Sequence, residues 1–410
     1  MKFRAFKAYR PATDKVHLVA SRSYITYSKK DLTQKLESNP FSFLHVINPG
    51  FNADKKLQGK AKLKAIRNKF EEFIKEHFLI QDQHKSFYLY KQIKEGFSCR
   101  GLIGCSSAKD YQEGKIKIHE STLTVRERKL KEYTDVVKIH AEPVCLTHDN
   151  NLDLDKILDQ TESTKPIYDF STTDNVRHIL WKIDDTTTLK QIETIYSEQI
   201  KTSYIADGHH RSASSLLYSI ENNHLAEDNN AHFFMSICVP KNQLKIFDYN
   251  RVVKSLNQLS EDEFLNKLEE NFIVEKLADN NQKPRQVHQI ILKLKNGDYL
   301  LLPKAEIIEK NNPVKRLDAQ LLTDYILSPI LGIDDLKNHP DISFVNGTEP
   351  LEKYDLLIKK GKAQAAFILY PARLEDIKSV ADNNLHMPPK TTWVEPKLRS
   401  GLTIFDLETS

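Results

Sequence analysis

The octet Tyr204-Ile205-Ala206-Asp207-Gly208-His209-His210-Arg211 is the most informative stretch of this sequence. Its apolar first half is typical of a buried strand, and the Asp-Gly pair indicates where that strand ends. The run that follows, to about Asn222, has the length of a helix. We therefore expect a strand-to-helix turn near Gly208, with two imidazoles and one guanidinium in the first turn of the helix.

Residues at such a helix start favour the binding of an anion. The first N–H groups of a helix lack intrahelical partners and lie at the positive end of the helix dipole. Arg211 adds a planar fork that suits phosphate oxygens, and Gly208 lets the backbone approach a ligand closely. Cationic side chains at this end oppose the dipole, and an anionic ligand would reverse that cost. Asp207 is placed to cap the helix, accept a proton or bind a cation.

Two other interpretations of the octet stay open. In the first, the motif is structural: Asp207 caps the helix, and the histidines and Arg211 pair with carboxylates of the same protein. In the second, the histidines bind a metal ion. Adjacent helical residues point about 100° apart and rarely share one ion, which argues against the second.

Two further segments carry groups that suit phosphate chemistry. Lys115-Ile116-Lys117-Ile118-His119-Glu120 reads as a basic strand end leading into a helix that also holds Arg126, with Glu120 as a base or metal ligand. Met387 to Lys397 places lysines and hydroxyls beside prolines in an extended segment. Each has a structural alternative, a surface strand with an acidic helix start in one case and an ordinary proline-flanked loop in the other. We expect both segments to converge on the cleft at Gly208.

The order of elements around the octet predicts an α/β fold with some α+β character. A strand at 177–183, a helix at 187–201, a strand at 203–206 and the helix from Gly208 imply a crossover unit in a mixed sheet. We also expect a helix over 53–78, a hairpin across Pro240-Lys241-Asn242 and a hairpin at Asn296-Gly297. We place approximate boundaries that divide the chain into an N-terminal α/β region over 1–150, a region with the octet over 151–255, and a C-terminal α/β region over 256–410.

Composition excludes several classes of protein. The 410 residues include 60 basic and 56 acidic side chains, so the net charge of +4 gives no reason to expect a polyanion partner. No stretch has the roughly 18 to 20 apolar residues of a membrane helix. The four cysteines fit no zinc spacing and suit a reducing cytoplasm, which is the expected location.

The chain resembles, over essentially its whole length, the family catalogued as domain of unknown function 1015. The resemblance rests on the stretches FRAFKAYRP, NPFSFLHVINP, GLIGCSSAKDYQEGKIKIHESTLTVRERK, YIADGHHRSAS and MPPKTTWVEPKLRSGL. Two positions depart from the family pattern. Tyr249-Asn250-Arg251 stands where Thr-His-Arg is expected, and Ser212 stands where an aromatic residue is usual.

The octet is also similar to the signature of the ParB/sulfiredoxin-like fold. In that superfamily the motif lies at a helix start and holds nucleotide phosphates, and some members are free-serine kinases that use ATP or ADP. The family resemblance further implies an association with serine biosynthesis. A strand-to-helix phosphate-binding turn of this type is therefore the expected fold around Gly208.

Together these features predict an enzyme that transfers a phosphoryl group on a small hydroxyl metabolite, with serine or O-phosphoserine favoured. It would act as a kinase, as a phosphotransferase to ADP or as a phosphoserine phosphatase, with Mg²⁺ and ATP or ADP as expected cofactors. Asp207 and Glu120 are the Mg²⁺ candidates. The catalytic candidates are Asp207, His209, His210 and Glu120. The phosphate- or substrate-binding candidates are Gly208, Arg211, Lys117, His119, Arg126, Arg251, Lys390, Thr391 and Lys397.

An alternative function from another class is a nucleotide-binding regulator or DNA-associated ParB-like protein without catalysis. The near-balanced charge and the lack of a helix-turn-helix pattern or basic tail argue against DNA. We therefore expect a phosphorylated small molecule or a nucleotide as partner, and neither a membrane nor a nucleic acid.

Overall fold

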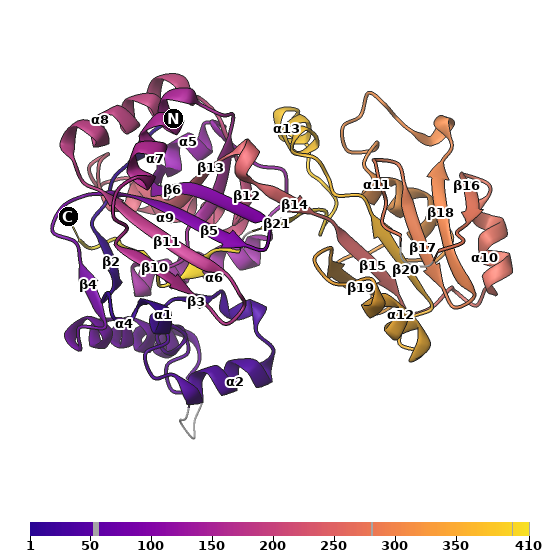
Figure 1. Ribbon diagram of the computed structural model, residues 1–410, viewed down its shortest axis with the longest axis horizontal. Coiled ribbons are helices and arrows are strands. Elements are labelled where there is room, and N and C mark those ends of the chain that lie inside the picture. Colours follow the sequence, from indigo (N-terminus) through magenta and orange to yellow (C-terminus); the bar gives the residue numbers. More distant parts are fainter. Residues whose placement is uncertain (52–56, 280–281, 396, 410) are drawn as a thin grey trace. The chain divides into compact units, whose positions relative to one another are not determined.

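A computed structural model describes residues 1–51, 57–279, 282–395 and 397–409 (Figure 1). The chain divides into two compact units. The first unit comprises Met1–Lys117, Thr122–Leu244 and Pro396–Ser410, and the second comprises Ile118–Ser121 and Lys245–Glu395. The end of the chain therefore belongs to the same unit as its beginning.

A mixed sheet organises the first unit. Its strands follow the order β10-β11-β5-β6-β13-β9-β12-β7, and β1 pairs with β6. The pairs β13–β9 and β12–β7 are parallel and the others antiparallel, which confirms the expected mixed α/β sheet. The strands are β1 (Phe3–Arg4), β5 (Phe87–Lys94), β6 (Phe97–Ser107), β7 (Ile116–Lys117), β9 (Val144–His148), β10 (Tyr168–Ser171), β11 (Arg177–Ile183), β12 (Ser203–Asp207) and β13 (Phe233–Pro240).

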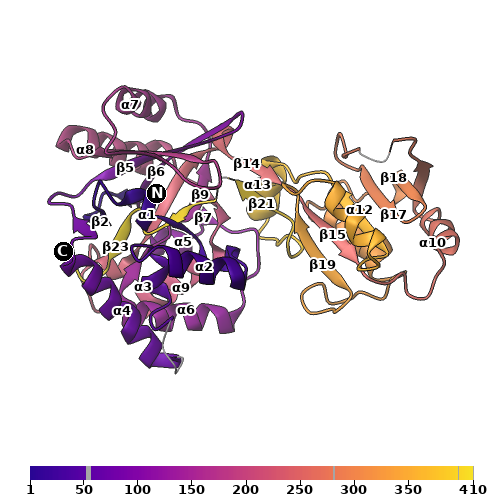
Figure 2. The same ribbon diagram turned by 60° about the horizontal axis from the view of Figure 1, so that its bottom comes forward.

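Helices cover both faces of this sheet. Figure 2 shows α7 and α8 on one side of β5 and β6 and α6 and α9 on the other. Helix α9 presents small residues to the protein interior, where Ser212, Ala213, Ser214 and Ser215 are buried. Small side chains let this helix lie close to its neighbours α5 and α6. The helices are α5 (Ala108–Gln112), α6 (Thr124–Val137), α7 (Leu152–Glu162), α8 (Thr186–Thr194) and α9 (His209–Glu221).

A smaller layer joins the two ends of the chain. Its strands follow the order β4-β2-β23-β8, and β22 pairs separately with β3. The expected helix is present as α4, which buries Ile66, Phe70 and Phe73 in the core of this layer. Residues 53–56 of the predicted helix lie outside the described residues. The elements are β2 (Ala8–Pro11), α1 (Val16–Val19), β3 (Ser21–Arg22), α2 (Lys29–Ser38), α3 (Leu44–Ile47), α4 (Gly59–Lys75), β4 (Leu79–Gln81), β8 (Ile139–His140), β22 (Arg399–Ser400) and β23 (Ile404–Asp406).

The second unit is built on an antiparallel sheet in the order β16-β18-β17-β20-β15-β19. The hairpin expected at Asn296-Gly297 is confirmed, because Leu294 pairs with Gly297. The elements are β14 (Lys245–Phe247), β15 (Tyr249–Val253), α10 (Glu261–Leu268), β16 (Phe272–Lys276), β17 (Ile290–Leu294), β18 (Gly297–Pro303), α11 (Asp318–Leu322), β19 (Ile342–Asn346), α12 (Glu352–Lys359), β20 (Ala365–Leu369), α13 (Leu374–Asp382) and β21 (Trp393–Glu395).

The hairpin expected across Pro240-Lys241-Asn242 is wrong. Strand β13 is flanked by β6 and β9 in the first unit, while β14 pairs with β21 in the second. The chain passes from one unit to the other after Leu244, so the turn signal marks a linker between units. The expected boundary near residue 150 falls inside the first unit, where β9 and β12 pair across it.

Two further findings concern the cysteines and the helices. The four cysteines Cys99, Cys105, Cys145 and Cys238 are buried and form no disulfide with one another. Within the described ranges, no helix has the length and apolar character needed to cross a bilayer.

Gly104, at the centre of β6, provides a test of the packing between the sheet and the N-terminal strand. A Cβ at this position would lie 2.6 Å from Cζ of Phe3 and 2.8 Å from Cε1 of Phe87. Gly104→Ala should therefore lower the free energy of unfolding of the first unit by about 1–3 kcal/mol, because two buried rings must move. Urea denaturation measures the loss. Ser98→Ala, at an exposed position of the same strand, should change stability by less than about 0.5 kcal/mol, and equal effects would contradict the packing.

Candidate functional site

The turn between β12 and α9 has the predicted form. Strand β12 ends at Asp207, Gly208 occupies the N-cap position, and α9 begins at His209. Gly208 has φ of +106°, a left-handed conformation that residues with a side chain rarely adopt. A Cβ there would also lie 3.1 Å from Nε and Nη2 of Arg211. The left-handed backbone therefore favours glycine here, and a side chain would also press against the guanidinium. The helix cap is Gly208 and not Asp207.

Strand pairing determines which groups lie beside the turn. Strand β12 is antiparallel to β9, and its register shifts between Ile205 and Asp207. Such an irregularity bends a strand and redirects the side chains that follow. On the other side β7 is parallel to β12, with Lys117 opposite Tyr204. The carboxyl ends of β7 and β12 therefore share one edge of the sheet, which is where open α/β sheets bind ligands.

Arg211 is held by acceptors of the protein itself. Its Nη2 donates to Oδ2 of Asp207 at 3.0 Å. Its Nη1 donates to the carbonyl oxygens of Pro143 at 2.8 Å and Glu142 at 3.1 Å, and lies 2.9 Å from Oε1 of Glu142. Ser400 donates to the other carboxylate oxygen of Glu142 at 2.9 Å. The guanidinium thus anchors Asp207 to the start of β9.

Lys397 approaches Asp207 from the end of the chain. Its Nζ lies 3.6 Å from Oδ1 of Asp207, and its carbonyl oxygen accepts a hydrogen bond from Nε2 of Gln92 at 3.1 Å. The side chains of Asp207 and Lys397 are 44% and 28% exposed, so a ligand in solution can reach both. Asp207 therefore lies between two cationic groups in an open part of the first unit.

These cations set the charge state of Asp207. Desolvation by its surroundings raises the pKa of the carboxyl, but Lys397, Arg211 and His209 outweigh it and hold the pKa below the usual value. The group is therefore a carboxylate at neutral pH. An ionised carboxylate of low pKa accepts hydrogen bonds and binds cations well, and it is a weak proton acceptor.

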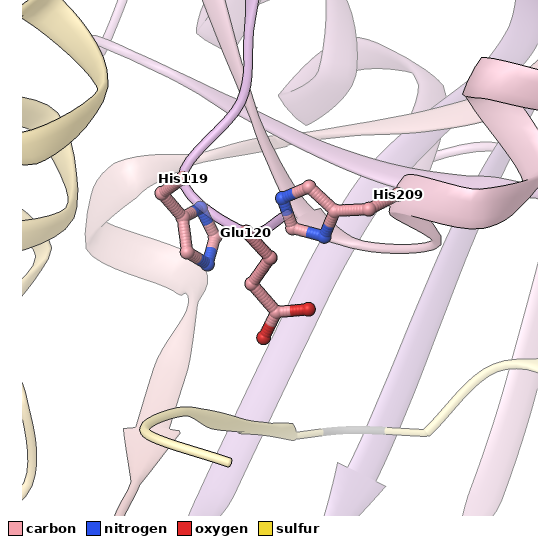
Figure 3. A group of neighbouring side chains, drawn as sticks. All are labelled: His119, Glu120 and His209. Atoms are coloured by element: carbon pink, nitrogen blue, oxygen red, sulfur yellow. The ribbon is translucent and has the colours of Figure 1, made fainter. Parts of the chain in front are cut away.

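His119, Glu120 and His209 form a group that suits a metal ion (Figure 3). One ligand atom from each lies within 4.8 Å of the others, and both histidines are buried. His119 and Glu120 lie in Ile118–Ser121, a short segment that is grouped with the second unit but follows Lys117 and precedes Thr122 of the first. Two imidazoles and one carboxylate are typical ligands of zinc and other transition metals, whereas Mg²⁺ prefers oxygen. Of the two residues that the sequence suggested for Mg²⁺, Glu120 belongs to this group and Asp207 does not.

The remaining predicted residues do not all belong to the first unit. Arg126 is exposed in the first turn of α6. Three others belong to the second unit. Arg251 is fully buried and donates to the carbonyl oxygen of Tyr249, and Thr391 donates to that of Pro388 at 2.7 Å. Lys390 is exposed, with its Nζ 5.2 Å from the ring centre of Tyr249. A phosphate role for these four residues stays a prediction.

Two residues at the site had no sequence signal. Glu142 supplies acceptors for Arg211, and Gln92 holds the backbone of Lys397. Both lie far from the octet in sequence, on or beside strands whose apolar pattern draws attention to other residues. Their part depends on the register of the sheet and on the return of residues 397–406 to the first unit.

Comparisons with solved structures show similarity at low identity. A free serine kinase in complex with AMP is 14% identical with a TM-score of 0.37, covering 74% of this chain and 90% of that one. A conserved hypothetical protein from Pyrococcus furiosus is 14% identical with a TM-score of 0.36, covering 74% and 95%. C-terminally truncated SbnI from Staphylococcus aureus is 10% identical with a TM-score of 0.36, covering 72% and 82%.

Among curated proteins no sequence matches this chain. A family model does match, over residues 3–320, a range that includes the octet, the segment Lys115–Glu120 and Glu142. Lys397 lies beyond the matched range. This chain therefore belongs to the family described as Protein of unknown function (DUF1015).

Proposed function

We propose that the site at the start of α9 transfers a phosphoryl group to or from a small hydroxyl metabolite. Serine or O-phosphoserine is the favoured substrate, and ATP or ADP is the nucleotide partner. The observation that carries the proposal is the ionised carboxylate of Asp207, held between Arg211 and Lys397 beside the N-terminus of a helix. Phosphoryl transfer needs an oriented hydroxyl and positive charge around the transferred group, and this arrangement offers both.

Asp207 is proposed to orient the attacking hydroxyl. In the loose transition state of phosphoryl transfer the nucleophile is little bonded, so positioning matters more than early removal of its proton. A carboxylate with a lowered pKa suits this role, because it accepts a hydrogen bond from the hydroxyl without first becoming protonated.

The phosphoryl oxygens are assigned to Lys397, His210 and the first N–H groups of α9. A helix N-terminus and an ammonium group both stabilise the negative charge of a phosphate. Arg211 is assigned a positioning role, since its terminal nitrogens already donate to Asp207, Glu142 and Pro143. His119, Glu120 and His209 would hold a divalent ion, which would supply positive charge to stabilise the phosphate.

Phosphorus NMR on the purified chain tests the proposal and gives the direction of transfer. One sample contains serine, ATP and a divalent ion, with Mg²⁺, Mn²⁺ and Zn²⁺ in parallel. Another contains O-phosphoserine with ADP, and a third contains O-phosphoserine alone. We expect growth of phosphoserine, of ATP or of inorganic phosphate in at least one sample. If ATP or ADP binds while none of these signals changes, the protein is a nucleotide-binding regulator and the proposed catalysis is wrong.

Asp207→Asn should separate catalysis from folding. The amide keeps the shape of the side chain but removes its charge, so the hydroxyl loses its charged acceptor. We expect turnover per folded molecule to fall by about a hundredfold or more, while the weakened contacts with Arg211 and Lys397 lower the melting temperature without unfolding the chain. Asp169→Asn is the matched control, because it breaks an exposed ion pair with Arg177 on the same sheet. Normal turnover in the Asp207 variant would remove Asp207 from the mechanism.

Lys397→Met should move the pH profile of the reaction. Methionine keeps the aliphatic stem and removes the ammonium that helps to lower the pKa of Asp207. The carboxyl should then protonate at a higher pH, so the acid limb of kcat/KM should shift upward, and KM for the phosphorylated substrate should rise. The control is Lys156→Met, at a lysine whose side chain is 73% exposed. An acid limb that stays in place would show that Lys397 does not act on the titrating group.

A further inference from the structure

A cavity in the second unit has polar groups that the proposed reaction does not use. Its volume is about 270 Å³, just below the range of roughly 300–1,000 Å³ typical of sites for drug-sized ligands. Its walls come from the residue between β14 and β15, the start of α11, the end of β20 and the start of α13. Apolar side chains such as Leu317 and Leu369 line it together with Asp248, Asp318 and Arg316.

Asp248 offers this cavity a buried acceptor. Asp248 is 7% exposed, and its Oδ2 has no hydrogen-bond partner within the described residues. Burial raises the pKa of this carboxyl to about 6, and it remains largely ionised above neutral pH. A buried carboxylate oxygen without a partner costs stability, and a cationic ligand would remove that cost.

Asp318 is a second buried acceptor on the same cavity. It is 9% exposed, and both of its oxygens accept from a single donor, the backbone N–H of His288, at 2.9 and 3.1 Å. Burial raises its pKa to about 7, with Asp376 adding to the rise. One shared donor leaves lone pairs on this carboxylate that a ligand N–H can use.

Arg316 offers the matching donor. Its Nε is buried and has no partner among the residues that the structure describes. Its Nη2 lies 3.4 Å from Oδ1 of Asp376, but Arg373 already holds that carboxylate with Nε and Nη2, each at 3.0 Å. Arg373 therefore makes the shorter contacts with Asp376, and the Nε–H of Arg316 is the donor left for an anionic group in the cavity.

We propose that this cavity binds a small zwitterion, an α-amino acid with an apolar side chain. The ammonium group is bound by Asp248, with Asp318 as a second acceptor, the carboxylate is bound by Arg316, and the side chain packs against the apolar wall that includes Leu317 and Leu369. A phosphate is disfavoured by the two buried carboxylates. A bare divalent cation is disfavoured by the nearby guanidinium and needs more oxygen ligands than these. The proposal concerns a different cavity and a different ligand from the phosphoryl-transfer site.

Isothermal titration calorimetry on the full chain at pH 8 tests the proposal. The probes are L-alanine, L-valine, L-leucine and L-methionine. L-Serine is left out because the proposed reaction gives it a separate site. We expect at least one probe to bind with 1:1 stoichiometry. For the best probe, the matching amine without the carboxylate and the matching acid without the ammonium should each bind about tenfold or more weakly. No binding by any of the four probes would overturn the proposal, and so would equal binding of the amine or the acid.

Three variants place the binding in this cavity. Asp248→Asn keeps the shape and removes the charge, and it should weaken binding about 10- to 100-fold. The charge of Asp248 also offsets the buried guanidinium of Arg251, so circular dichroism first checks that the variant is folded and binding is compared per folded molecule. Arg316→Gln should weaken the binding of the amino acid but not the binding of the matching amine. Glu275→Gln, at an exposed position on β16, should change neither. Unchanged binding in both the Asp248 and Arg316 variants would show that the amino acid binds elsewhere. Phosphoryl transfer is not part of this readout, so the two proposals fail independently.

Discussion

The guanidinium of Arg211 lies across the turn between β12 and α9, close against Gly208. From that place it bonds Asp207 on one side and the chain at Glu142 and Pro143 on the other. The end of one strand, the start of a neighbouring strand and the start of a helix are thus joined by one side chain. The direction of the Asp207 carboxylate, and with it the chemistry of the site, depends on this contact.

The ends of the chain complete that arrangement. Residues 399–406 return to the first unit by pairing with β3, β2 and β8, and Lys397 stands immediately before them. Its ammonium group helps to keep Asp207 ionised. Arg211 and Lys397 stabilise the charged form of Asp207, and its pKa therefore lies below the usual value. Clusters of titratable groups with shifted pKa values are common at binding and catalytic sites.

Buried charged residues of the second unit are paired in one place and incompletely paired in another. Lys293 is fully buried and its ammonium reaches both Asp298 and Asp355, at 2.7 and 2.8 Å, so each charge there has a partner. On the cavity, by contrast, an oxygen of Asp248 and a nitrogen of Arg316 lack partners within the described residues. The charges around Lys293 are thus paired within the protein, whereas polar groups of opposite charge around the cavity keep unpaired atoms. A ligand site requires such groups around a cavity.

Local patterns in the sequence were sufficient to predict the turn at Gly208, the strand and helix around it, the 294–297 hairpin and the mixed α/β class. Each depends on residues near one another in the chain, through propensity, periodicity and turn chemistry. The partners of Arg211, the place of Lys397 beside Asp207, the pairing of β14 with β21 and the cavity at Asp248 depend on the tertiary structure. These contacts join residues that are up to hundreds of positions apart in the chain. Which residues meet is decided by the register of the sheets and by the way the C-terminal segment packs back onto the first unit. No local sequence pattern encodes either of these.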